Sequence, residues 1–311
     1  MNVIRFGLLF LFAFSVLAFG SVEIWSQSIL EIGASVLFVA WAAIAFIQPG
    51  FKVEWNPLNW PFLGWIAIGV AQLSLHVTPY PFLTRVELLK LLAYILIFFL
   101  STQVFRERRD LTQLAWFLIV LCFSVSLLGI IQFFGGSEST IYGFRTLTEG
   151  GIPFGPFVNR NHFAGFIELT LPIGLALMIF RGLRRDMFPL AALLTIVPVG
   201  AIVLSGSRGG IVGFAFEVAI LALLTRYRGG PQGARLAALG IVGLATLALI
   251  VWLGAGKVLE RFSGLRAGDV TLSRRATMVR GGMHIFLDHP IVGAGIGSLV
   301  AVYPRYETVY D

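Results

Sequence analysis

The chain has 311 residues, of which 57% are hydrophobic and only 13% are charged, and its net charge is +7. A soluble domain carries about 25% charged residues, so this composition excludes a soluble globular enzyme and predicts an integral membrane protein. The positive charges are spread over loops between apolar stretches, which indicates membrane topology rather than nucleic-acid binding.

Apolar stretches follow one another along the chain as far as about residue 255. A transmembrane helix needs about 20 mainly apolar residues. Nine segments fit, the third only weakly, so the sequence predicts an all-α, polytopic membrane bundle of about nine transmembrane helices. In the fourth segment, Glu87 and Lys90 have the three-residue spacing that lets them pair on one helix face. The segments are 5–22, 28–48, 61–76, 85–103, 112–134, 162–181, 187–205, 210–226 and 236–255.

The first segment has two interpretations. Its charged start and short apolar run resemble a signal peptide, with a possible cleavage site at Ala18-Phe19-Gly20 that would remove residues 1–20. We favour a first transmembrane helix because many more apolar segments follow it.

Basic residues indicate how these segments are oriented. Arginines follow the fourth, sixth and eighth segments, which is every second loop, as the positive-inside rule requires of cytoplasmic loops. The N-terminus is therefore expected in the cytoplasm, and residues 135–161, 206–209 and 256–311 outside. The arginines are Arg106, Arg108, Arg109, Arg181, Arg184, Arg185, Arg226, Arg228 and Arg235.

This topology divides the chain into three parts. Residues 1–110 form N-terminal transmembrane helices, residues 111–255 a transmembrane core, and residues 256–311 the start of a large outside loop. The chain ends within that outside segment, at Tyr310-Asp311, which predicts a fragment of a longer protein.

Arg208 is the most unusual residue in the sequence. It lies between two long apolar runs, in the string Ser205-Gly206-Ser207-Arg208-Gly209-Gly210. A guanidinium there is costly unless an anion binds it. The glycines allow a tight turn, and the next helix, expected from about Gly210, would point its free N–H groups outward. The alternative is an ordinary turn between helices, which would use the same glycines.

Further basic residues are expected outside, against the usual bias. Because arginine binds phosphate oxygens in bidentate fashion, a phosphorylated lipid is a candidate ligand. The alternative is that these side chains reach lipid head groups or pair with carboxylates. They are Arg145, Arg160, Lys257, Arg261, Arg266, Arg274, Arg275 and Arg280.

Other polar residues also have two interpretations. Asn161 and His162, at the start of the sixth segment, could orient a sugar or a phosphate, or Asn161 could simply cap the helix. Glu168 and Glu217 lie within apolar segments, where a carboxylate is either functional or paired with an arginine.

The string Asp288–Gly297 reads DHPIVGAGIG. Its glycine spacing lacks the full dinucleotide fingerprint and the strand–helix context, so we reject a nucleotide loop. His289 precedes Pro290 and is expected to end a helix over about residues 274–288. No motif has metal-ligand spacing, so neither a metal nor another cofactor is predicted.

Three strings in order resemble the landmarks of the O-antigen ligase and O-antigen polymerase superfamily. They are residues 155–164 (GPFVNRNHFA), residues 204–210 (LSGSRGG), and Arg275 through residues 288–297. The resemblance covers about residues 110–311, whereas residues 1–110 resemble the family only in hydropathy.

The resemblance implies a metal-independent glycosyltransferase of the bacterial inner membrane with a periplasmic active face. Such enzymes move a glycan from undecaprenyl pyrophosphate to lipid A core, a growing polymer or a protein. Carried over by motif, Arg208 and Arg275, and also Arg160, would bind the donor pyrophosphate. The catalytic residue is not assigned, because the family's acceptor-activating histidine would lie beyond the chain end. Possible supporting residues are Asn161, His162, Arg274 and Arg280.

Two other functions account for part of the sequence. A transporter of a lipid-linked or anionic solute could line its path with the same arginines, although no repeat symmetry or pair of broken helices is visible. A non-catalytic envelope-assembly subunit would leave the arginines individually dispensable. The sequence does not separate ligase, polymerase and protein-glycosylating transferase, because these differ in their acceptor.

Overall fold

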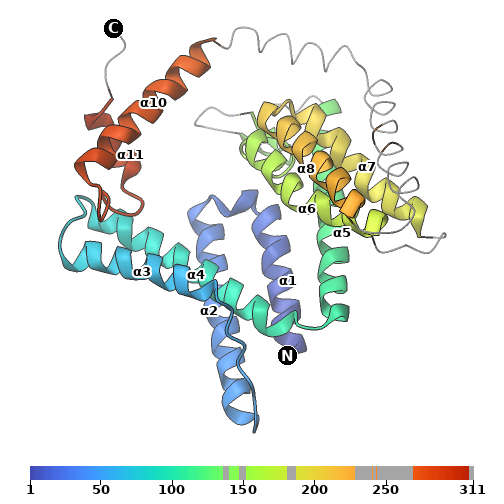
Figure 1. The fold of residues 1–311 in the computed structure, drawn as a ribbon, viewed down its shortest axis with the longest axis horizontal. Helices are drawn as coiled ribbons and strands as arrows, with labels where there is room; N and C mark the ends of the chain where they lie inside the picture. The colour runs from blue at the N-terminus through green and yellow to red at the C-terminus, as the bar shows by residue number, and fades with distance from the viewer. Residues whose placement is uncertain are drawn as a thin grey trace. The chain divides into compact units, whose positions relative to one another are not determined.

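A computed structural model describes residues 1–135, 140–146, 152–180, 187–227, 240, 243 and 269–307. This part of the chain is mostly helical (Figure 1). The only strands described are β1 (Thr140–Ile141) and β2 (Arg145–Thr146), which form an antiparallel hairpin. The longer helices are α1 (Asn2–Leu17), α2 (Ile24–Ile47), α3 (Asn59–Ser74), α4 (Pro81–Val104), α5 (Arg108–Phe134), α6 (Arg160–Phe180), α7 (Phe188–Ser205), α8 (Arg208–Tyr227) and α10 (Asp269–Asp288). The short ones are η1 (Phe19–Ser21), α11 (Leu299–Val302) and η3 (Tyr303–Arg305).

The hydropathy pattern located the helices well. Each of the first eight predicted segments coincides with one of α1 to α8, and the ninth, 236–255, lies outside the described residues. Within the described residues, three helical stretches are long and apolar enough to cross a membrane: Ile24–Ile47, Arg108–Phe134 and Arg160–Met178. The mostly helical fold is thus confirmed, with three candidate membrane-spanning helices among the described residues, while the number of nine spans and the orientation stay predictions.

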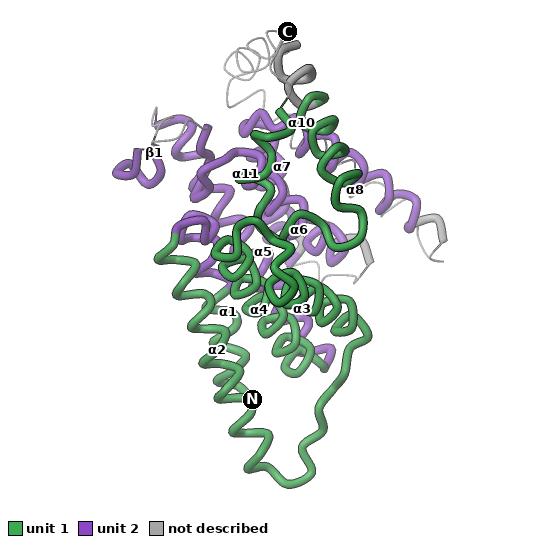
Figure 2. Tube along the Cα trace, turned by 90° about the vertical axis from the view of Figure 1, so that its left-hand side faces the viewer, with its two compact units in different colours: residues 1–11, 24–106, 265–311 green, residues 12–23, 107–264 purple. Residues whose placement is uncertain are grey.

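The chain forms two compact units (Figure 2). The first unit comprises residues 1–11, 24–106 and 265–311, and the second comprises residues 12–23 and 107–264. In the first unit, α4 packs against both α2 and α3. Glu87 and Lys90 of α4 form the predicted ion pair.

The segment that follows α10 packs onto α3 and α4, and residues 289–298 are called the docking segment below. Gln72 of α3, only 2% exposed, binds this segment with both ends of its amide. Its Nε2 donates to the carbonyl of Val292, and its Oε1 accepts from the amide of Ile296 at 2.9 Å. The α10 helix ends at Asp288, before the His289-Pro290 pair, as predicted.

A buried cluster of hydroxyl groups completes this contact. Thr78 Oγ1 lies 2.9 Å from Thr84 Oγ1 and 3.2 Å from Ser298 Oγ. Gly297 has a φ of +77°, and a Cβ there would overlap Glu87 and approach the carbonyl of Leu83 to 3.2 Å. The glycine-rich string is therefore a packing element that needs close backbone approach.

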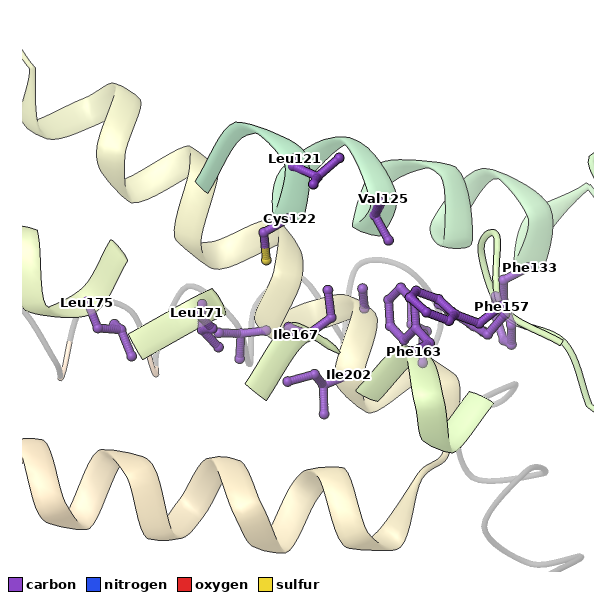
Figure 3. Close-up of a cluster of buried hydrophobic side chains, with 14 of the residues drawn as sticks. Leu121, Cys122, Val125, Phe133, Phe157, Phe163, Ile167, Leu171, Leu175 and Ile202 are labelled. Carbon is purple, nitrogen blue, oxygen red and sulfur yellow. The ribbon is translucent and has the colours of Figure 1, made fainter. Parts of the chain in front are cut away.

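The second unit is built around α5, α6 and α7, with α8 packed against α6. Its buried core contains Leu121 and Val125 of α5, Phe163 and Ile167 of α6, and Ile202 of α7 (Figure 3). This core holds the α6 helix in place. The first residue of that helix, Arg160, belongs to the candidate site.

Candidate anion-binding site at two helix N-termini

The loop before α6 is folded tightly and determines where this helix begins. Phe154 and Phe157 exchange backbone hydrogen bonds of 3.1 and 3.3 Å. The ring of Phe154 lies 4.6 Å, centroid to centroid, from the ring of Phe163 in the core. The amide of Arg160 donates to the carbonyl of Ile152 at 2.9 Å, so Arg160 becomes the first residue of α6.

The side chain that caps α6 is Asn159. Its Oδ1 accepts a hydrogen bond from the amide of Asn161 at 2.8 Å, which is the usual N-cap arrangement. Of the two interpretations of Asn161, the one in which it caps the helix is therefore wrong, because the cap lies two positions earlier. Asn161 and His162 lie in the exposed first turn, and Asn161 Oδ1 accepts a hydrogen bond from Ser207 Oγ at 3.0 Å.

The N-terminus of α8 is also built by capping. The α7 helix stops at Ser205 because Gly206 adopts the left-handed conformation, with a φ of 65°. Ser207 is buried, and its Oγ accepts from the amide of Gly210 at 3.3 Å. The helix thus begins at Arg208 rather than near Gly210, and Arg208 is its exposed first residue.

The bond between Ser207 and Asn161 joins the two helix N-termini. It brings Arg160 and Arg208 close enough for their positive charges to repel each other. A cation at a helix N-terminus is also disfavoured by the helix dipole, typically by about 0.3–1 kcal/mol. Two arginines thus lie where both their mutual repulsion and the helix dipoles disfavour positive charge.

A third helix that begins with arginine shows the contrast. Arg108 is the first residue of α5, where Glu107 and Asp110 form a capping box, so two carboxylates lie at the start of this helix. Neither α6 nor α8 has an acidic residue in its first turn. Their positive ends are therefore suited to an anion supplied from outside the helix.

Two carboxylates lie deeper along the same pair of helices. Glu168 of α6 lies against α8, since a Cβ on Gly213 would be 2.8 Å from its Oε1. Glu217 of α8 is close enough to Glu168 for the two carboxylates to repel. Each has a buried oxygen without a hydrogen-bond partner, and among the described residues neither forms an ion pair with an arginine.

Arg145 has a structural role. Its guanidinium forms an ion pair with Glu23 and lies 4.4 Å above the ring of Phe19. These contacts fasten the β1–β2 hairpin to the turn after α1. The interpretation that Arg145 pairs with a nearby carboxylate is confirmed.

The remaining basic residues lie on α10 or outside the described residues. Arg274, Arg275 and Arg280 lie on α10, in the first unit, and Arg280 is exposed. Lys257, Arg261 and Arg266 lie outside the described residues. Across the described ranges, no three His, Cys, Asp or Glu side chains gather as metal ligands would.

Sequence reasoning missed the polar residues that build the site. Asn159 and Ser207 each directly precede the arginine that starts a helix. An Asn or Ser in that position is a typical N-cap signal and would have located both helix starts. The hydrogen bond from Ser207 to Asn161 has no local signal, because the two residues are 46 positions apart.

The apolar helices are those of a helical membrane protein, and a comparison with known families adds a match over part of the chain. Residues 190–311, less than half of the chain, match the model of the O-antigen ligase family. The matched range contains Arg208, Arg275 and the docking segment. No curated protein and no solved structure matches the chain. The family and the apolar helices together indicate a glycosyltransferase-type enzyme of the bacterial inner membrane.

The capping role of Ser207 can be tested by substitution. Ser207→Ala removes the acceptor for the amide of Gly210 and the donor to Asn161, and loss of a cap typically costs about 1 kcal/mol. We expect a measurably lower thermal unfolding temperature for the purified protein in detergent. Ser124→Ala is the matched control, because Ser124 is an exposed helical serine that bonds only to the carbonyl of Val120. Equal shifts for the two variants would contradict this role.

Proposed function

We propose that the chain binds the donor of a glycosyltransferase that moves a glycan from undecaprenyl pyrophosphate to an acceptor at the periplasmic face. The observation that carries this proposal is the pair Arg160 and Arg208 at two joined helix N-termini without acidic residues in their first turns. A pyrophosphate would relieve the repulsion between these charges and satisfy the exposed ends of both helices.

The proposed chemistry follows from the charge of the site. Guanidinium groups bind phosphate oxygens in bidentate fashion and would hold the pyrophosphate in one orientation. The acceptor hydroxyl attacks the anomeric carbon and gives its proton to a general base or to water, and the bond from that carbon to the pyrophosphate breaks. Negative charge then grows on the leaving pyrophosphate, where the arginines stabilise it without protonation of the leaving group and without a metal ion.

The α10 helix is proposed to carry a second set of phosphate-binding side chains. Arg275 matches the family motif, with Arg274 and Arg280 on the same helix in support. We also propose the predicted topology of nine spans with a cytoplasmic N-terminus. In that topology the start of α8 and the whole of α10 face the periplasm.

The test is a glycan-transfer assay in a strain that lacks its own ligase and polymerase. The gene is expressed through its natural stop codon, together with a matched lipid-linked donor. Polymer attached to lipid A core would identify a ligase, and lengthened lipid-linked polymer a polymerase. If the protein reaches the membrane and neither product forms, nor any glycosylated protein, the proposal is wrong.

A further inference from the structure

An apolar groove lies between α3 and α4 in the first unit. Its volume is about 450 Å³, which falls in the range of single ligand sites, about 300–1,000 Å³. Arg85 is the only polar residue that lines it. The other lining residues are Ile66, Val70 and Leu73 of α3 and Leu88, Leu89 and Leu92 of α4.

The spacing of these residues gives the groove a direction. On each helix they are three or four positions apart, so they form one stripe along the helix. Because residues 75–80 join the end of α3 to the start of α4, Leu73 and Arg85 lie towards the joined end. Ile66 and Leu92 lie towards the open end, about 10 Å away for the seven residues from Arg85 to Leu92. The groove is therefore a short apolar channel with one cationic end.

The groove occupies the face of the hairpin that the docking segment leaves uncovered. Gln72, Thr84 and Glu87 face the docking segment. Leu88 of α4 packs directly against Gly69 of α3, because a Cβ added to this glycine would lie 2.5 Å from the leucine Cδ2. The outer side chains of the groove remain open, since Val70 is 50% and Leu89 56% exposed.

The charge at the joined end is not neutralised within the hairpin. Arg85 is exposed and forms no ion pair with any residue that the structure describes. The neighbouring Lys90 is paired with Glu87, so these two charges cancel. Residues 85–90 of α4 thus carry one net positive charge, and the positive N-terminal end of the helix adds to it.

We propose that this groove binds an anionic phospholipid, with one acyl chain along the apolar stripe and the phosphate on Arg85. Basic pockets between membrane helices recognise anionic lipid head groups in this way. A single guanidinium suits the single charge of a phosphodiester. A channel of about 10 Å takes the upper part of one acyl chain, rather than a long polyprenyl chain. This inference does not depend on the proposed transferase function.

The test is native mass spectrometry of the complete protein in detergent. The probes are phosphatidylglycerol and phosphatidylethanolamine with identical acyl chains, and undecaprenyl phosphate as a third. We expect phosphatidylglycerol to bind in preference to both. Arg85→Gln should lower its affinity about fivefold, the ratio expected for one basic residue near an anionic lipid. Leu89→Trp, which fills the groove from an exposed position, should weaken both phospholipids.

Arg305→Gln is the matched control, because Arg305 is another exposed arginine of the same unit. It should leave the preference for phosphatidylglycerol unchanged. Equal binding of the two phospholipids, or no change in Arg85→Gln, would overturn the proposal. Preferential binding of undecaprenyl phosphate that depends on Arg85 would assign the groove to a different lipid and overturn it as well.

Discussion

Arg208→Ala is expected to lower glycan transfer by roughly 10²- to 10³-fold, the usual effect of removing one donor that stabilises a developing oxyanion. Arg208 is the first residue of α8, whose start is joined to the start of α6 by the hydrogen bond from Ser207 to Asn161, where the pyrophosphate is proposed to bind. Arg208→Lys should also transfer poorly, because an ammonium group cannot hold two phosphate oxygens in a fork. The measurement is the yield of transferred glycan at equal amounts of membrane-inserted protein.

Arg108→Ala is the matched control for this prediction. Arg108 is also exposed and also begins a helix, but two carboxylates, those of Glu107 and Asp110, lie at the start of that helix. Transfer by this variant should stay at the level of the unchanged protein. Unchanged transfer by Arg208→Ala would remove the central support for the proposed donor site.

Gln72→Leu is expected to release the docking segment. Leucine keeps the bulk of the buried side chain but leaves the carbonyl of Val292 and the amide of Ile296 without partners. An unsatisfied buried group costs about 1–3 kcal/mol, and because Val292 and Ile296 are half-buried, we expect each of their groups to cost an amount towards the lower end of that range. Hydrogen–deuterium exchange over residues 289–298 should become markedly faster, and thermal stability should fall.

Two further variants sharpen this second prediction. Gln113→Leu is the same substitution at an exposed position of α5 and should change neither exchange nor stability. Gly297→Ala should also loosen the segment, because the added Cβ would overlap Glu87 in a backbone conformation that disfavours alanine. Slow exchange in both Gln72→Leu and Gly297→Ala would show that the docking segment does not depend on these contacts.

Hydropathy predicted where the helices lie, because runs of about 20 apolar residues leave few alternatives. It did not give their ends. The α6 and α8 helices begin earlier than predicted, at Arg160 and Arg208, since their starts depend on the capping side chains of Asn159 and Ser207. A capping side chain acts through one hydrogen bond, and a single residue hardly changes the mean hydropathy of a segment of about 20 residues.

The candidate site was predictable in part. The cost of a guanidinium between two apolar runs singled out Arg208 from the sequence alone. The closeness of Arg160 to Arg208 requires the packing of α6 on α8, which has no local signal. The same limit applies to Gln72, whose partners are 220 and 224 positions away.

The docking segment also has a consequence for how the chain is made. Gln72, Thr78 and Thr84 are buried polar residues whose partners include Val292 and Ser298, synthesised more than 200 residues later. Protein synthesis proceeds at about 5–20 residues per second, so roughly 10 to 40 s pass between synthesis of the α3–α4 hairpin and synthesis of the docking segment. During that interval the polar groups of the hairpin need water, lipid head groups or the insertion machinery as temporary partners, because an unsatisfied group in hydrocarbon is costly. Closure of the hairpin onto residues 289–298 is therefore a late step in the biogenesis of this protein.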